Sequence, residues 1–237
     1  MKSIYKRVLI KISGEAMAGD QKQGINEDVI TKLCLALKKA VEETGVEIAI
    51  VVGGGNFWRG AKNPAFDRSD ADHMGMLATV MNAIALKDKL RQLGVPAVAM
   101  SAIEMNAICE LYVRAKADEY LRSGKIVILG CGTGSPFFTT DTGAALRAAQ
   151  LSCDAILLAK NIDGVYDSDP AKNPGAKKYD RISMSEVLAK NLKVMDLTAT
   201  AFCLEHDMPL SVFEIRDPEN VLRVLSGEKI GTEVYCG

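Results

Sequence analysis

Histidine is scarce in this sequence, and neither sign of charge dominates it. The 237 residues include only two histidines, His73 and His206, and the formal net charge is −1. Two histidines so far apart suggest no Ser/His/Asp or Cys/His catalytic set. A near-neutral balance argues against a general nucleic-acid or membrane-surface binder, because such proteins carry a basic excess. We therefore expect no nucleic-acid partner, while a local basic pocket for a phosphorylated small molecule remains open.

Long apolar runs and paired cysteines are also missing. The charge-free run Met74–Leu86 is shorter than the about 20 apolar residues that span a bilayer, so we expect no membrane segment. Near the N-terminus, Lys11 and Glu15 interrupt what would be the apolar region of a signal peptide. The six cysteines form no CxxC pair and have no histidine at zinc-binding spacing. This pattern favours reduced, buried thiols in a cytoplasmic protein over metal ligands.

Two nucleotide-binding signatures are absent. Without GxxxxGK[ST] the chain is not a P-loop enzyme, and without a GxGxxG after the first strand a Rossmann oxidoreductase loses its best marker. Disorder is excluded as well, because 48% of the residues are hydrophobic.

Apolar, β-rich runs alternate with helical stretches along the chain. The predicted strands are Arg7–Ile12, Glu47–Val52, Ala97–Ser101, Ile126–Leu129, Ala155–Ala159 and Leu210–Ile215. The predicted crossover helices are Glu27–Glu43, Asp72–Leu93, roughly Ala107–Arg122, and Thr142–Gln150. This rhythm indicates an α/β fold in which helices cover both faces of a mainly parallel sheet. The length favours one domain, which can be lobed, over two.

The rhythm breaks after Lys160. Residues 161–182 are rich in Asn, Asp, Gly and Pro, which predicts turns or a hairpin, and a C-terminal lobe can begin there.

Upstream, the Met74–Leu86 helix has only Thr79 and Asn82 as polar residues, so it needs cover on more than one face. A central core position and a subunit contact fit that pattern equally well.

Glycine-rich turns follow four of the predicted strands. They are Ser13-Gly14, Gly53-Gly54-Gly55-Asn56, the segment 130–135, and the segment 160–164. In an open parallel sheet, ligands bind outside the carboxyl ends of the strands. Glycines there let backbone N–H groups approach and donate to an anion. Several such turns at one edge favour a phosphate site over simple chain reversal.

Two cations have positions that matter. Lys11 lies within the first apolar strand, two residues before the Ser13-Gly14 turn, and can direct its ammonium to a phosphate. An exposed face of an edge strand is the alternative, and the apolar flanks disfavour it. Arg59 follows the Gly53–Gly55 turn and can hold the same anion bidentately, although a surface arginine fits equally well.

Four polar residues precede helical stretches. Thr140 or Asp141 can cap the helix that begins at Thr142, and Asp72 and Asp196 can cap the helices that follow them. A helix N-terminus also favours an anion, so each position is compatible with capping alone or with a ligand site. Phosphoryl transfer to a phosphate would explain the scarcity of histidine, because that acceptor needs no strong base and catalysis rests on positioning and charge neutralisation.

The order of these motifs resembles the amino acid kinase superfamily and, within it, the bacterial-type uridylate (UMP) kinases. The similarity covers essentially the whole chain. Its most specific segments are YKRVLIKISGEA (5–16), VVGGGNFWRG (51–60), DHMGMLATVMN (72–82), GTGSPFFTTD (132–141), NIDGVYDSDP (161–170) and KVMD (193–196). The resemblance implies a three-layer α/β/α sandwich, with a nucleoside-monophosphate lobe over about 1–155 and an ATP-binding lobe over about 156–237.

The resemblance also implies roles for individual residues. ATP would be held by Lys11, Ile12, Ser13, Gly14, Gly55, Arg59, Asn161, Tyr166 and Asp169, the last three at its adenosine. UMP would be held by Gly54, Asp72, Thr133, Gly134, Ser135, Pro136, Phe137, Phe138, Thr139 and Thr140. The catalytic set would be Lys11, Arg59, Asp141 and Asp196. The two aspartates would organise the phosphates and Mg²⁺, with no side chain assigned as a metal ligand.

The implied reaction transfers the γ-phosphoryl group of ATP to UMP, giving UDP and ADP for pyrimidine nucleotide synthesis. The resemblance further implies a homohexamer built as a trimer of dimers, inhibition by UTP and modulation by GTP. Two alternatives remain: an amino acid or carbamate kinase of the same fold, and a non-catalytic nucleotide-binding relative. The 132–141 segment disfavours the first, and the joint presence of Lys11, Asp141 and Asp196 disfavours the second.

Overall fold

A nine-stranded sheet forms the centre of the computed structural model, which describes residues 2–59 and 65–237. Its strand order is β4-β3-β5-β2-β1-β6-β10-β11-β9, and all neighbours pair in parallel except β10 and β11. The bounds are β1 Arg7–Ile12, β2 Glu47–Val52, β3 Ala97–Ser101, β4 Glu110–Leu111, β5 Ile126–Gly130, β6 Ala155–Lys160, β9 Arg181–Ser183, β10 Leu210–Glu214 and β11 Thr232–Tyr235. A separate antiparallel hairpin joins β7 (Val165–Tyr166) to β8 (Lys178–Tyr179).

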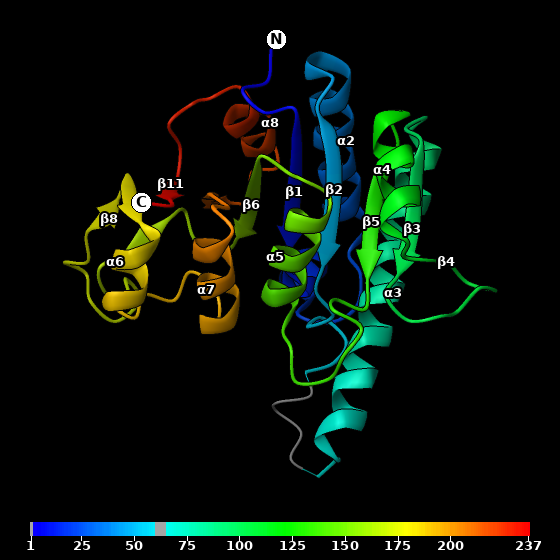
Figure 1. Ribbon diagram of the computed structural model, residues 1–237, viewed down its shortest axis with the longest axis horizontal. Coiled ribbons are helices and arrows are strands. Elements are labelled where there is room, and N and C mark those ends of the chain that lie inside the picture. The colour runs from blue at the N-terminus through cyan, green and yellow to red at the C-terminus, as the bar shows by residue number, and fades with distance from the viewer. Residues whose placement is uncertain (1, 60–64) are drawn as a thin grey trace.

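Helices cover both faces of the sheet (Figure 1). One face carries α1 (Gly14–Ala18), α2 (Glu27–Thr44), α3 (Arg68–Gln92) and α8 (Asn220–Leu225). The other carries α4 (Arg114–Arg122), α5 (Thr140–Gln150), α6 (Met184–Ala189) and α7 (Leu197–Glu205). The expected three-layer α/β/α sandwich is thereby confirmed.

Alternation along β1 sorts its side chains between two hydrophobic cores. Val8, Ile10 and Ile12 pack on the α2–α3 side, whereas Leu9 packs on the α5 side. Successive side chains of a strand point to opposite faces, so Lys11 shares the face of Leu9 and projects toward α5. The central strand thus delivers one ammonium to the carboxyl edge of the sheet, on the α5 side.

The strand predictions are confirmed to within one residue, and residues 161–182 contain the expected hairpin. Three predicted helix starts are wrong. The helix α3 begins at Arg68 because Asp67 caps it, so Asp72 lies inside the helix rather than at its start. The helix α5 is capped by Thr139, not by Thr140 or Asp141. The helix α4 begins only at Arg114, because β4 and a loop occupy the preceding residues.

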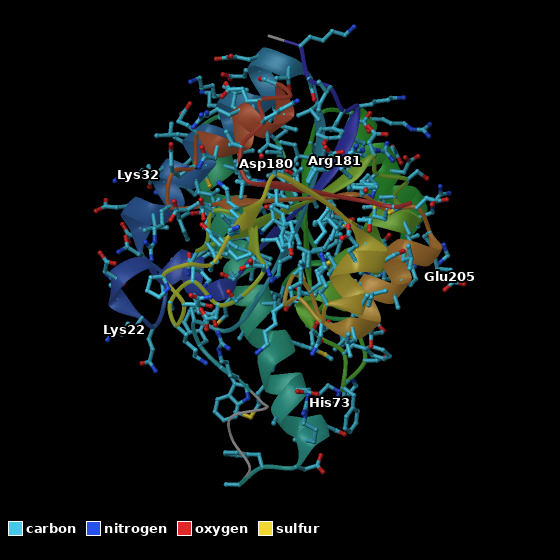
Figure 2. All side chains as sticks on the ribbon, turned by 90° about the vertical axis from the view of Figure 1, so that its left-hand side faces the viewer. Lys22, Lys32, His73, Asp180, Arg181 and Glu205 are labelled. Carbon is cyan, nitrogen blue, oxygen red and sulfur yellow. The ribbon has the colours of Figure 1, made fainter. Side chains whose placement is uncertain are left out.

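The N-terminal turns of α3 project beyond the carboxyl ends of the strands (Figure 1). His73 lies on this projecting part (Figure 2). One side of the helix is buried through Met76, Val80 and Leu86, while Met74 and Met81 remain exposed together with Leu77, the last at 56%. The apolar helix is therefore covered by its own chain on one side only.

No helix among the described residues is long and apolar enough to cross a membrane.

The six cysteines are free thiols, and all but Cys236 are buried. Burial raises the pKa of the Cys34, Cys153 and Cys203 thiols to about 12. These thiols are therefore protonated and unreactive at neutral pH.

Candidate active site

A cavity of about 380 Å³ lies at the carboxyl edge of the sheet. Its walls come from the turns after β1, β2 and β5, from the projecting turns of α3, and from the start of α5. The lining residues are Lys11, Ser13, Gly14, Glu15, Gly53, Gly54, Gly55, Trp58, Arg59, Arg68, Asp72, Gly75, Met76, Thr79, Cys131, Gly132, Thr133, Ser135, Phe138, Thr139, Thr140 and Asp141. Three of the four glycine-rich turns predicted from the sequence meet here.

An ion pair between Lys11 and Asp141 spans the floor of this cavity. The Lys11 Nζ lies 2.9 Å from Asp141 Oδ1, and both side chains are mostly buried, at 13% and 19% exposure. β1 supplies the lysine, and the first turn of α5 supplies the carboxylate. The pair holds the ammonium in place without occupying all of its three donors.

Asp196 reaches the site through two threonines. Its carboxylate accepts hydrogen bonds from the hydroxyls of Thr139 and Thr142, the latter at 3.1 Å. The same carboxylate caps α7 by accepting from Ala199 N at 2.9 Å. The capping role that the sequence offered for Asp196 is therefore confirmed, and its carboxylate also ties the start of α7 to the start of α5.

Glycine is required where the turns after β1 and β2 approach each other and α3. A Cβ on Gly54 would lie 2.6 Å from the Gly75 carbonyl oxygen and 2.8 Å from the Ala78 Cβ. A Cβ on Gly14 would lie 2.6 Å from Gly55 N. Because the obstacles are largely backbone atoms, these turns could not pack this closely with side chains present.

The guanidinium of Arg59 forms an ion pair with the carboxylate of Glu15. That carboxylate lies directly over Gly55, where an added Cβ would clash with Glu15 Oε1. Arg59 and Gly55 are two of the expected phosphate contacts, so a carboxylate stands beside the groups expected to hold an anion.

The loop from Cys131 to Thr139 is held in an unusual backbone conformation. Two of its non-glycine residues, Cys131 and Phe137, have φ values of +62° and +71°. The Cys131 N–H donates to the Thr79 hydroxyl at 2.7 Å, and the Phe137 N–H donates to Asp72 Oδ2 at 2.8 Å. Two bonds to α3 thus stabilise a conformation that L-residues rarely adopt.

Asp72 also accepts a hydrogen bond from Arg68 Nε at 2.9 Å, and the Arg68 guanidinium lies 5.7 Å from the centre of the Phe137 ring. The projecting turns of α3 and the tip of the loop are therefore linked by a small polar cluster at the mouth of the cavity.

Most predicted site residues line the cavity, and some do not. Ile12 is buried in the core, and Gly134, Pro136 and Phe137 belong to the loop without lining the cavity. Asp196, of the predicted catalytic set, also lies outside the lining, behind Thr139 and Thr142. The expected adenosine residues Asn161, Tyr166 and Asp169 lie outside the lining, around the β7–β8 hairpin, where the Tyr166 hydroxyl donates to Asp163. The structure thus gathers most of the residues expected at the phosphates and at UMP, and leaves apart those expected at the adenosine.

Several lining residues were not singled out as site candidates from the sequence. Glu15, Trp58, Gly132 and Met76 lie within or beside the segments quoted for the resemblance, so their neighbourhood was the available signal. Arg68 had no such signal, because its role depends on the earlier start of α3.

Comparisons with known proteins agree with this geometry. A family model described as the amino acid kinase family matches residues 6–214. The UMP kinase of Bacillus anthracis has 37% sequence identity and a TM-score of 0.94, over 98% of this chain and 96% of that chain. The UMP kinase of Ureaplasma parvum has 39% identity and a TM-score of 0.91, over 99% and 100%. The uridylate kinase of Archaeoglobus fulgidus has 26% identity and a TM-score of 0.73, over 96% and 99%.

The match to the family model spans most of the chain, and two solved structures exceed 30% identity over nearly the whole of both chains. The resemblance drawn from the sequence motifs is therefore confirmed. The chain belongs to the amino acid kinase family.

Proposed function

We propose that this protein is a uridylate kinase, which transfers the γ-phosphoryl group of ATP to UMP and releases UDP and ADP. The observation that carries the proposal is the Lys11–Asp141 pair at the floor of a glycine-lined cavity, closed on one side by the 131–139 loop. The similarity over full length to solved UMP kinases supports the choice of acceptor.

The reaction needs positioned charge more than it needs a base. A phosphate with a second pKa near ~6 is already largely dianionic at pH 7, so the attacking oxygen of UMP carries no proton to remove. The Lys11 ammonium, fixed by Asp141 at 2.9 Å, neutralises charge on the transferring group. Arg59 adds a second cation at the mouth, once an incoming phosphate shares it with Glu15.

The acceptor half is assigned to the loop, to Gly54 and to Asp72. Thr133, Ser135, Phe138, Thr139 and Thr140 line the cavity and are placed to surround UMP, with Gly134, Pro136 and Phe137 shaping the loop. Asp72 has one carboxylate oxygen engaged by Arg68 and by the Phe137 N–H. Its other oxygen is available to a ribose hydroxyl, so the Asp72 carboxylate would bind both the substrate and the loop.

The donor half is assigned to the turns after β1 and β2 and to the C-terminal lobe. Ser13, Gly14 and Gly55 line the cavity beside Lys11 and hold the phosphates of ATP, next to Ile12 at the end of β1. The adenosine then extends toward Asn161, Tyr166 and Asp169, outside the cavity lining. With these turns contributing to the ATP phosphates, we keep the nucleoside-monophosphate lobe at about 1–155 and the ATP-binding lobe, which would hold the adenosine, at about 156–237.

Magnesium fits the site as a companion of the nucleotide. No group of three or more His, Cys, Asp or Glu side chains able to hold a metal was found in residues 2–59 and 65–237. Mg²⁺ with ATP needs only one or two carboxylates beside phosphates and waters, and Asp141 and Asp196 can supply them. The ion would neutralise charge on the phosphates, while Lys11 and Asp141 keep their own geometry.

Assembly and control follow the same assignment. The exposed Met74, Leu77 and Met81 on α3 would form a subunit contact within a hexamer built as a trimer of dimers. UTP would inhibit by occupying the UMP pocket through its uracil, and GTP would act as an effector. An enzyme with reduced thiols that supplies pyrimidine nucleotides belongs in the cytoplasm.

A coupled ADP-release assay tests the proposal. The protein is mixed with ATP and Mg²⁺ and offered UMP, CMP, dUMP or acetylglutamate in parallel. We expect turnover to be highest with UMP by a wide margin. Comparable turnover on CMP would remove the uridylate assignment, turnover on acetylglutamate alone would indicate an amino acid kinase, and none on any acceptor would indicate a nucleotide-binding relative.

A further inference from the structure

We propose that Lys160 is a further positioning residue for phosphoryl transfer, holding the Lys193–Val194 segment so that Asp196 keeps its place at the active site. This inference rests on the kinase function proposed above. It concerns a residue outside the cavity lining and outside the predicted catalytic set.

The position of Lys160 follows from the sheet. It is the last residue of β6, and β6 pairs in parallel with β1, so Lys160 follows Ala159, which is the partner of Ile12. Its other neighbour is β10, where Glu214 is its register partner. A lysine at this point projects from the same carboxyl edge that carries the glycine turns.

The ammonium of Lys160 is bound by backbone rather than by a carboxylate. Its Nζ donates to the Val194 carbonyl and lies 3.5 Å from the Lys193 carbonyl. Among the ion pairs found between described residues, none includes Lys160. Burial lowers the pKa of this lysine, with the nearby Lys11 ammonium acting in the same direction and Asp141 in the opposite one. The group therefore lies within electrostatic range of the catalytic pair.

The segment that Lys160 holds leads directly to Asp196. Asp196 lies two positions after Val194, and its carboxylate binds the Thr139 and Thr142 hydroxyls and caps α7. Thr139 in turn caps α5, the helix that places Asp141 against Lys11. The hydrogen bonds of Lys160 and of Asp196, joined by the backbone of residues 194–196, thus connect β6 to the helix that carries Asp141 of the Lys11–Asp141 pair.

A purely structural role explains this arrangement less well. A partly buried ammonium without a carboxylate partner is unfavourable, and an apolar side chain of similar length would fill the same space at lower cost. The Lys160 ammonium can orient the carbonyl groups of Lys193 and Val194, which lie just before Asp196 in the chain. The charge is therefore best explained by the geometry of Asp196.

The test compares Lys160→Met and Lys160→Arg with the unmutated chain in steady-state kinetics with UMP and ATP. We expect kcat of Lys160→Met to fall about 10-fold to 100-fold, the scale of a small misplacement of a reacting group, with KM for UMP little changed. Lys160→Arg keeps donors for both carbonyls and should recover part of kcat. Lys190→Met, at an exposed lysine paired with Glu186 in the same lobe, is the control and should match the unmutated chain.

A double-mutant cycle with Asp196→Asn tests the route of the effect. If Lys160 acts through Asp196, the double variant should be about as slow as Asp196→Asn alone, since the two changes then remove one interaction. Multiplicative losses, or a Lys160→Met variant with unaltered kcat, would overturn the proposal.

Folding is checked by thermal melting of Lys160→Met and of a second variant, Lys160→Gln. Failure of both variants to fold would assign the lysine to stability and would also overturn the proposal. The kinase assignment fails separately, because it requires UMP-dependent ADP release by the unmutated chain.

Discussion

Lys11 and Asp141 are 130 positions apart in the sequence and 2.9 Å apart in space, in a cavity that the glycine-rich turns help to line. A charge in such a place acts mainly on the charge that develops during reaction, because the groups are fixed before the substrate arrives. Two predictions at the residue scale separate that role from a structural one.

Replacing Lys11 by alanine should lower kcat about 100-fold to 1,000-fold, the scale of removing one fixed electrostatic partner of the transition state. The melting temperature should change little, because Lys11 makes its ion pair at the cavity and not within the hydrophobic cores. Kinetics and thermal melting of the same preparation check this, with the exposed Lys6→Ala as control. A Lys11→Ala enzyme with near-normal kcat would make the lysine structural.

Replacing Asp141 by asparagine should reduce kcat about 100-fold while leaving the fold intact. The reason is that Thr139, and not Asp141, caps α5, so the change removes charge without removing the cap. In contrast, Thr139→Ala should lower the stability by about 1 kcal/mol, the usual loss for a cap. Denaturant unfolding and kinetics on both variants check the contrast, which an unstable Asp141→Asn would contradict.

At the scale of elements, the site depends on how closely the turn after β2 approaches α3. The Gly54 Cα faces the Gly75 carbonyl and Ala78. The turn and α3 both supply residues that line the cavity. The helix also holds the 131–139 loop through Thr79 and Asp72. Displacing α3 would therefore disturb the cavity at several points together.

Gly54→Ala should lower stability by about 1–3 kcal/mol, the usual effect of overpacking against atoms that cannot move aside. Gly75→Ala is the matched variant, because its Cβ would meet only the Trp58 ring at 3.9 Å. That change lies within a helix, where alanine is favoured over glycine by about 1 kcal/mol, so stability should hold or rise. Denaturant unfolding of the pair checks this, and equal losses would refute the close approach.

At the scale of the whole molecule, α3 leaves an apolar side uncovered by the described part of the chain. Met74, Leu77 and Met81 are exposed on the same helix whose opposite side holds the core and whose Asp72 reaches the cavity. A rigid helix that joins a substrate contact to a subunit contact would link the sites of neighbouring subunits.

Met81→Glu should dissociate the subunit contact or abolish the response to UTP, because a carboxylate would be buried without a partner in the assembled protein. Sedimentation velocity of the variant and the unmutated chain measures the change. The same substitution at Leu35, which is 48% exposed on α2, serves as control. A fully active monomer of the unmutated chain would refute both the assembly and the coupling.

Local pattern was sufficient to predict six strands of the sheet, the hairpin and the family, whereas the short strands β4, β9 and β11 were missed. Alternating apolar residues and glycines at the strand ends are local consequences of strand geometry. They indicated that Lys11 lies in a strand, two residues before the Ser13-Gly14 turn. The helix starts were harder to predict, because several polar residues in a row can cap a helix. Asp67 and Thr139 took that role in place of the residues first considered.

The sequence by itself therefore determined the α/β architecture, the carboxyl-edge location of the site and most of its lining. Only the tertiary structure decided which charges meet: Lys11 with Asp141, Glu15 with Arg59, Asp72 with Arg68 and the loop, and Lys160 with the segment before Asp196. The physical reason is that a strand or turn pattern depends on neighbours in sequence, whereas an ion pair depends on distances between elements that only packing sets.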